Sequence, residues 1–291
     1  MIAGYNHLTQ TQENKWIFNA AGDSWQVWDR PDGCNFIHIV MIGAGGGGGG
    51  GIQKGSPGAA TNGGAGGAAA GVSVLTLPTY AIQNRLYIQV GVGGAGGLGN
   101  TAGSVGTQTY VSLVPNTTVT TAHLLYTATT TPGGLSNGGA GGAASVTFAV
   151  GAPGMAGKFQ TIVPAIAGQN GGSTTNIDQT RIVGGGAGAA NNSTLNVNGN
   201  AITSSYSQPS SVIICPASPA GLASQAFDGL SILKPMPQFF GGPSGSSNAS
   251  VQGCNGGNGG IGCGGGGGGT GFILPSSGGR GGDGMVIITC W

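Results

Sequence analysis

Glycine runs with a three-residue repeat constrain the fold of this chain more than any other feature. Of its 291 residues 66 are Gly, and many of them form Gly-Gly-X repeats with Ala or Asn at X. Three residues per turn is the period of a polyproline-II helix, so two of its faces would lack side chains. We therefore predict packed polyglycine-II helices with X residues facing outward; the alternative is flexible linkers. The repeats lie at residues 62–67, 93–97, 137–142 and 255–260.

Apolar runs of strand length separate the glycine repeats. Residues 36–42, Phe-Ile-His-Ile-Val-Met-Ile, end at glycine and favour a buried strand over a helix. Residues 30–33, Arg-Pro-Asp-Gly, predict a turn. Because glycine at this density opposes helices, we expect an all-β fold: an antiparallel β-sandwich, jelly-roll-like, with packed polyglycine-II helix insertions. Further strands are predicted at residues 24–28, 72–77, 85–92, 109–114, 124–127, 146–150, 212–215 and 285–291.

The charge of the chain is low, and its basic residues are scattered from Lys15 to Arg280. Eight basic and seven acidic residues give a net charge of +1. Without a stripe of Lys and Arg, binding to nucleic acid or to an anionic membrane surface has little electrostatic support. No apolar run reaches the ~20 residues that membrane insertion requires. The first fifteen residues lack the basic and apolar regions of a signal peptide. We therefore expect the protein to be part of a virion that is assembled in a host cytoplasm and released by lysis.

No pattern in the sequence points to catalysis, a cofactor or a metal. Residues 43–48 match G-x-G-x-x-G, but a dinucleotide fold would next require a helix and an acidic residue, and no acid occurs between Asp32 and Asp178. The histidines lie far apart and lack Cys or acid neighbours at metal-binding spacing. With only seven carboxylates in the chain, paired-acid catalysis is not expected. We expect a protein that is not an enzyme.

The five cysteines are too few and too dispersed for a disulfide framework. If strand 36–42 pairs antiparallel with 285–291, Cys34 and Cys290 lie close together, with or without a bond. A Cα separation above ~7 Å would exclude a bridge. Cys254 and Cys263 could bridge or could serve as small fillers between glycine helices, and a reducing cytosol favours fillers.

The four tryptophans cluster towards the two chain ends. They are Trp16, Trp25, Trp28 and Trp291. Two interpretations stay open: the indole rings cap the β-core, or they form an attachment surface for another protein, since Trp is frequent both in cores and at interfaces.

Several motifs occur in an order that resembles a known family. An apolar strand at 34–44 enters the run Gly45–Gly51, strands at 71–77 and 86–92 follow, and Gly-Asp-Gly at 282–284 precedes a final apolar strand. This order resembles the glycine-rich domain found in phage tail-fibre, adhesin and other virion structural proteins, over roughly residues 34–150 and 270–291. The resemblance implies a virion role and, for residues 151–269, a polyglycine-helix sandwich like those of short adhesins at fibre tips.

The expected organisation has three parts. Residues 1–33 form an attachment segment and edge strand, 34–150 plus 270–291 form the glycine-rich β-sandwich core, and 151–269 form a displayed region. We expect a bacteriophage tail-fibre, spike or adhesin component on the virion. Its expected partners are other virion proteins, a host surface glycan or outer-membrane protein, and further copies of itself, a trimer being one form. The alternatives are a capsid decoration protein without receptor binding and a cellular extracellular glycine-rich adhesive protein.

Overall fold

The computed structural model describes about half of the chain in full and isolated strands elsewhere. Side chains are described at residues 14–53, 63–115, 226–229, 231, 241–248 and 252–291, and backbone alone at residues 60–61, 124–128, 161–162, 174–176, 191–192, 202–204, 212–215, 232 and 238–239. The expected strand at 146–150 and the glycine repeat at 137–142 lie outside these residues.

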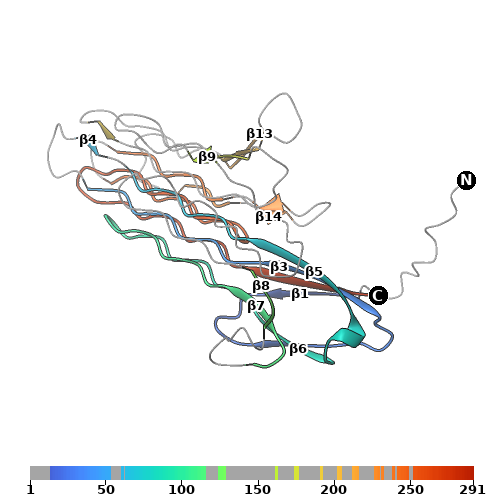
Figure 1. Ribbon diagram of the computed structural model, residues 1–291. Helices are drawn as coiled ribbons and strands as arrows, with labels where there is room; N and C mark the ends of the chain where they lie inside the picture. The colour runs from blue at the N-terminus through green and yellow to red at the C-terminus, as the bar shows by residue number, and fades with distance from the viewer. Residues whose placement is uncertain are drawn as a thin grey trace, which may run out of the picture.

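Two four-stranded antiparallel sheets form the core of the molecule (Figure 1). The first sheet has the order β1-β16-β3-β5 and the second has the order β2-β6-β7-β8. The strands of the first sheet are β1 (Lys15–Asn19), β16 (Met285–Cys290), β3 (Phe36–Ile42) and β5 (Val72–Pro78). Those of the second sheet are β2 (Gln26–Asp29), β6 (Arg85–Gln89), β7 (Thr109–Ser112) and β8 (Leu124–Ala128).

The period-two alternation of these strands places one face of each sheet in a shared core. In β3, Ile37, Ile39 and Met41 are fully buried, while the intervening residues are more exposed. Leu86 and Ile88 of β6 are also fully buried and belong to the same hydrophobic cluster. Because this cluster draws side chains from both sheets, the two sheets face each other across it. The all-β prediction is therefore confirmed at the level of antiparallel sheets.

The remaining secondary structure is short. A 3-10 turn, η1 (Thr79–Ala81), follows β5 and is the one helical element among the described residues. A third four-stranded sheet has the order β13-β12-β10-β9 and includes a parallel pair, β10 with β12. The short strands are β4 (Ala60–Thr61), β9 (Thr161–Ile162), β10 (Thr174–Asn176), β11 (Asn191–Asn192), β12 (Ile202–Ser204), β13 (Val212–Cys215), β14 (Ser231–Ile232) and β15 (Gln238–Phe239).

Most strand predictions hold, with adjusted ends. The strand at 36–42 has the bounds the sequence predicts, and β2 lies at the edge of its sheet as expected. β6 ends at Gln89 rather than at residue 92, because the chain then leaves the sheet to bond with glycine segments. β1 was not predicted, although Trp16 and Phe18 alternate with more exposed residues and pack on the core. The turn at 30–33 is present, with Gly33 at a φ of 78°.

Glycine-rich segments extend from the sheets and run side by side as wavy, extended traces (Figure 1). We call this part of the molecule the glycine bundle. Segment 43–51 continues β3, 63–71 leads into β5, 91–98 follows β6, 101–108 leads into β7, and 276–284 leads into β16. Segments 241–248, 253–260 and 262–271 complete the bundle.

Candidate functional site: the glycine bundle and its two ends

Segment 43–51 lies at the centre of the glycine bundle and bonds to its neighbours in strict rotation. Successive backbone N–H groups donate to a different neighbouring segment, and the same neighbour recurs every third residue. The donor and acceptor pairs, at 2.7–3.0 Å, are Gly45 to Gly282, Gly46 to Ala68, Gly47 to Ser104, Gly48 to Gly279, Gly49 to Ala65 and Gly50 to Thr101.

The carbonyl groups of the same segment accept bonds from two further neighbours. Gly94 and Gly97 donate to Gly45 and Gly48, and segment 262–271 bonds to it in the same three-residue spacing. Several glycines of this segment face a neighbouring backbone so closely that a side chain would clash. A Cβ added to Gly48 would lie 2.0 Å from the carbonyl oxygen of Gly266. Glycine is therefore required at this position because a neighbouring backbone occupies the space.

The expectation that X residues face outward is wrong for part of the bundle. Ala65 and Ala68 are fully buried, whereas Ala95 is exposed. A methyl group is small enough to be enclosed between segments, so Ala at X occurs both inside and outside. Cys254 and Cys263 are also fully buried and form no disulfide bond, which corresponds to the filler alternative.

Asparagine at X has a structural role that the sequence analysis missed. The side-chain Oδ1 of Asn255 accepts the N–H of Ser277 at 2.8 Å, and Oδ1 of Asn258 accepts the N–H of Arg280 at 2.9 Å. The two asparagines thus occupy donors on segment 276–284 that would otherwise require water. The three-residue spacing of Asn in the Asn-Gly-Gly repeat was the signal for this ladder.

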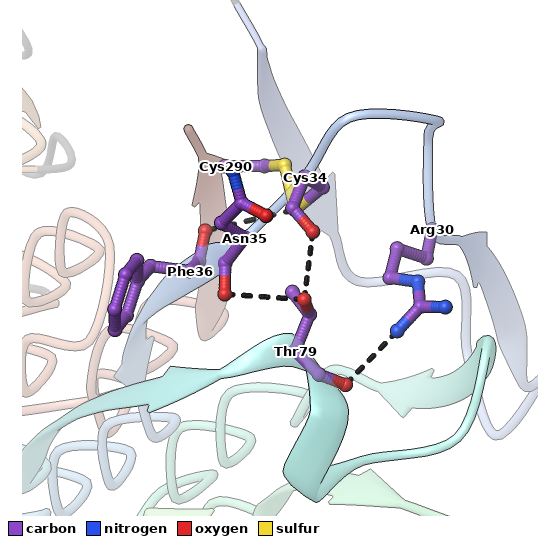
Figure 2. Close-up of a disulfide and its surroundings, with 6 residues drawn as sticks. All are labelled: Arg30, Cys34, Asn35, Phe36, Thr79 and Cys290. Atoms are coloured by element: carbon purple, nitrogen blue, oxygen red, sulfur yellow. Dashed lines mark hydrogen bonds between the residues drawn. A yellow bond between two sulfur atoms is a disulfide. The ribbon is translucent and has the colours of Figure 1, made fainter.

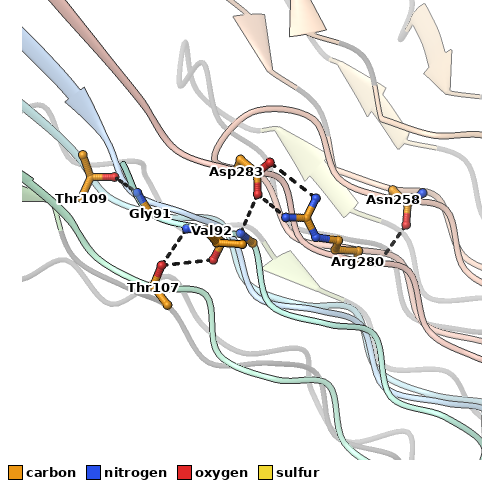
Figure 3. Close-up of polar contacts among 8 residues, drawn as sticks. Gly91, Val92, Thr107, Thr109, Asn258, Arg280 and Asp283 are labelled. Carbon is orange, nitrogen blue, oxygen red and sulfur yellow. Dashed lines mark hydrogen bonds and ion pairs between the residues drawn. The ribbon is translucent and has the colours of Figure 1, made fainter. Parts of the chain in front are cut away.

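A cluster of polar side chains ties the glycine bundle to the sheets (Figure 3). The hydroxyl of Thr109 donates to the carbonyl of Ile42 at 2.8 Å and accepts the N–H of Gly91 at 3.0 Å. The carboxylate of Asp283 accepts the N–H of Gly93 at 2.8 Å and forms an ion pair with Arg280. Asp283 therefore joins the segment that follows β6 to the segment that leads into β16, which explains the acid in Gly-Asp-Gly.

At the opposite end of the first sheet, Cys34 and Cys290 form a disulfide with a Cα separation of 5.7 Å (Figure 2). β3 and β16 pair antiparallel with Ile37 opposite Cys290, which is the pairing that the prediction assumed. The hydroxyl of Thr79 donates to the carbonyl of Cys34 at 2.7 Å, and Arg30 donates to the carbonyl of Thr79 at 2.9 Å. The disulfide joins the end of β16 to the turn that precedes β3.

The tryptophans divide between the core and the surface. Trp28 is 1% exposed and meets Trp16 edge-to-face at 5.8 Å. Both rings pack in the hydrophobic core, as the core-capping interpretation expects for them. Trp25 is half-buried. Trp291 is 52% exposed and stacks with Phe36 at a centroid distance of 6.3 Å. Phe36 is itself 45% exposed, so this pair forms an aromatic surface beside the disulfide.

Ionisable groups with shifted pKa values lie in the second sheet. The Arg85 guanidinium donates hydrogen bonds to the exposed Asp29 carboxylate and lowers its pKa. Partial burial raises the pKa of Tyr110, whose hydroxyl donates to Gln108 at 2.6 Å. Within the described residues, no group of three or more His, Cys, Asp and Glu is placed to hold a metal ion. The same residues include no helix long and apolar enough to cross a membrane.

Comparison with known proteins places this architecture in a family. No curated protein matches the chain. A family model described as a glycine-rich domain matches residues 20–291, which takes in the second sheet, the first sheet except β1, and all segments of the glycine bundle. Segment 262–271 runs without a break across the boundary expected at residue 269, and the match covers both sides of it. The chain therefore belongs to the glycine-rich domain family.

Proposed function

We propose that this protein is a non-enzymatic structural component of a bacteriophage virion surface, in a tail fibre, spike or adhesin. The observation that carries the proposal is the construction of the glycine bundle, whose neighbouring segments bond to one another at every third residue and five of whose segments continue sheet strands. Such a body is stiff because its extended chains are cross-linked through their backbones. The order of motifs, which resembles that of phage virion proteins, supports the same role.

The finer architecture in this proposal is a jelly-roll-like β-sandwich carrying polyglycine-II helices. Two features support it: the hydrophobic cluster shared by the two sheets, and the three-residue rotation of bonds around segment 43–51. A polyproline-II-type helix has three residues per turn and no internal hydrogen bonds, so its backbone groups are free to bond to neighbours.

The mechanism we propose is rigid presentation of host-contacting loops. A loop held at the end of a stiff body loses less entropy on binding than a loop on a flexible stalk, which favours affinity. At the far end of the bundle, Leu98, Ile273 and Leu274 are at least half exposed, and a Cβ added to Gly99 would lie 3.1 Å from the ring of Pro275. We propose that this end, with the displayed residues of 151–269, faces a host surface glycan or outer-membrane protein.

The aromatic pair at the other end of the molecule is the proposed attachment surface to another virion protein. Phe36 and Trp291 are exposed, stacked and supported by the adjacent disulfide. Aromatic residues are enriched in the buried centres of protein interfaces. Trp291→Ala should therefore lower the copy number of the protein in purified particles severalfold. The matched control is Tyr80→Ala, which removes a more exposed aromatic ring that stacks on no described partner.

The experiment that tests the proposed role is cryo-electron microscopy of intact particles with the protein labelled by a specific antibody fragment. Label at fibre tips or spikes supports the proposal. A regular array over capsid faces or vertices would replace it with the capsid decoration alternative. Particles that carry no label would overturn a virion role and favour the cellular adhesive alternative.

A further inference from the structure

The chain contains several pairs in which Asp or Asn precedes Gly, and such pairs can react without an enzyme. The glycine nitrogen attacks the side-chain Cγ, water leaves from Asp or ammonia from Asn, and a succinimide ring closes. Water then opens the ring to Asp or to isoaspartate, in which the main chain runs through the side-chain carbon atoms. Glycine favours the reaction because it has no side chain to hinder the attack. Within the described residues, these pairs begin at Asp32, Asp228, Asn255, Asn258 and Asp283.

In the glycine bundle, each Asn-Gly pair is bonded twice to one residue of a neighbouring segment. Gly256 donates its N–H to the carbonyl of Ser277 at 2.9 Å, and Oδ1 of Asn255 accepts the N–H of Ser277 at 2.8 Å. The pair that begins at Asn258 bonds in the same way to Arg280, at 2.8 and 2.9 Å. Ring closure requires the glycine nitrogen and the side-chain amide to leave these partners. Both reacting groups are therefore held away from the geometry of attack.

The Asp-Gly pairs in and beside the glycine bundle are held through their glycines. Gly229 donates its N–H to the carbonyl of Asn258 at 2.7 Å, while the carboxylate of Asp228 accepts the N–H of Asn258 at 2.9 Å. After Asp283, Gly284 donates its N–H at 2.9 Å to a carbonyl of the segment that follows β6. In these pairs too, the attacking nitrogen is bonded to a backbone oxygen.

The pair of Asp32 and Gly33 lies outside the bundle, in the turn before β3. The N–H of Cys34 donates to the carbonyl of Pro31 at 3.4 Å, and Gly33 has a φ of 78°, as the third position of a type II turn requires. The N–H of that third residue takes no part in the bond that closes the turn. The described part of the chain offers no hydrogen-bond partner to the Gly33 N–H or the Asp32 carboxylate, and both residues are exposed.

We propose that Asp32 is a site of spontaneous isoaspartate formation, and that hydrogen bonds protect the pairs in and beside the glycine bundle from the same reaction. A bonded pair reacts only when its segment opens locally, so its rate falls as the free energy of opening rises. The turn at Asp32 needs no such opening. Folding thereby inverts the order of reactivity, since Asn-Gly reacts faster than Asp-Gly in an unfolded chain. The reaction needs only water and does not depend on the proposed function.

The product alters the turn that carries the disulfide. Isoaspartate adds a carbon atom to the main chain between Pro31 and Cys34, so the N–H of Cys34 no longer meets the carbonyl of Pro31 in the same geometry. Because Cys34 is bonded to Cys290, the change lies directly beside the covalent link between this turn and β16.

The test compares two variants of the full chain, Asp32→Asn and Asp228→Asn, each of which creates an Asn-Gly pair. Both positions are exposed, but of the two following glycines in the structure only Gly229 has a bonded N–H. Peptide mapping by mass spectrometry gives the deamidation rate of the folded protein and of the protein in guanidinium chloride. Folding should slow Asp32→Asn less than about threefold and Asp228→Asn at least about tenfold, which corresponds to an opening free energy of about 1.4 kcal/mol or more.

The unmodified protein provides an independent measurement. Methylation by an isoaspartyl methyltransferase should locate isoaspartate at Asp32 in the folded protein, and at Asn255 and Asn258 chiefly after denaturation. Asp32→Glu should abolish the signal of the folded protein, because the larger ring closes far more slowly. Equal slowing of the two asparagine variants by folding would overturn the proposal, as would conversion of Asn255 in the folded protein at its denatured rate.

Discussion

The two sheets and the glycine bundle reach close packing by opposite means. In the sheets, buried side chains such as Ile39 fill the space between backbones. In the bundle, around Gly48, the backbones themselves are in contact and hydrogen bonds replace apolar burial. Ordering glycine costs more backbone entropy than ordering other residues, and each bond returns only about 0.5–1.5 kcal/mol. The bundle should therefore depend on the sheets, whose strands fix where its segments begin and end.

The strongest test of this contrast places a side chain where the bundle has none. We expect Gly48→Val to lower the free energy of unfolding by about 4 kcal/mol or more, because the carbonyl of Gly266 occupies the position of the new Cβ and cannot rotate away. Urea denaturation followed by tryptophan fluorescence gives the value. Ser104→Val, at an exposed position in the same bundle, should change it by less than about 0.5 kcal/mol. Equal costs at the two sites would mean that the segments are not packed backbone to backbone.

The second test asks whether the bundle survives without its sheets. Ile39→Ala removes a fully buried side chain and should cost about 2–5 kcal/mol of the free energy of unfolding. Hydrogen exchange of the glycine amides should accelerate in step with the loss of fluorescence, because the bundle unfolds with the sheets. Ile17→Ala, at a residue 45% exposed on the first sheet, should cost less. A bundle whose amides stay protected in the Ile39 variant would be an independently stable unit.

Breaking the disulfide is a change within the first sheet that leaves the contacts of the glycine bundle in place. Cys34 and Cys290 are separated by 256 residues in sequence, so their bond restricts the unfolded chain strongly. Reduction, or the double variant Cys34→Ser, Cys290→Ser, should lower the free energy of unfolding by about 2–4 kcal/mol. A reducing agent should have no further effect on the double variant. If reduction changes that variant as much as it changes the unmodified protein, the stabilisation comes from elsewhere.

Substitutions at the junction of the sheets and the glycine bundle should lower the free energy of unfolding by less than loss of the disulfide does. Asp283→Asn keeps an oxygen able to accept the N–H of Gly93 but loses the ion pair with Arg280. Because both side chains are partly exposed, we expect a loss below about 1 kcal/mol in the free energy of unfolding. Asp283→Ala also leaves the Gly93 donor without this acceptor and should cost about 1–3 kcal/mol. Similar losses for the two variants would show that the carboxylate charge, and not its position as an acceptor, matters at the junction.

The sequence predicted the sheets better than the details of the bundle, and the reason is physical. Strand 36–42 carries its own signal, because alternating side chains report which face is buried. A Gly-Gly-X repeat reports a period but not which neighbour lies on which face. For that reason the burial of Ala65 and the role of Asn258 as an acceptor became visible only when the segments were placed together. The Cys34–Cys290 proximity was accessible because strand pairing alone brings the two residues together.

The smallest expected effect is the dependence of stability on pH, which should arise in the sheets and not in the glycine bundle. The lowered pKa of Asp29, hydrogen-bonded by Arg85, stabilises the fold above the unfolded value of about 4, and this contribution is lost as pH falls through the folded pKa. The raised pKa of Tyr110 has the opposite sense: its contribution is present below about 10 and is lost as pH rises through the folded pKa. Both residues lie in the second sheet, so Asp29→Asn and Tyr110→Phe should flatten the acidic and alkaline limbs of the unfolding midpoint respectively. An alkaline limb that persists in Tyr110→Phe would show that a group other than Tyr110 titrates there.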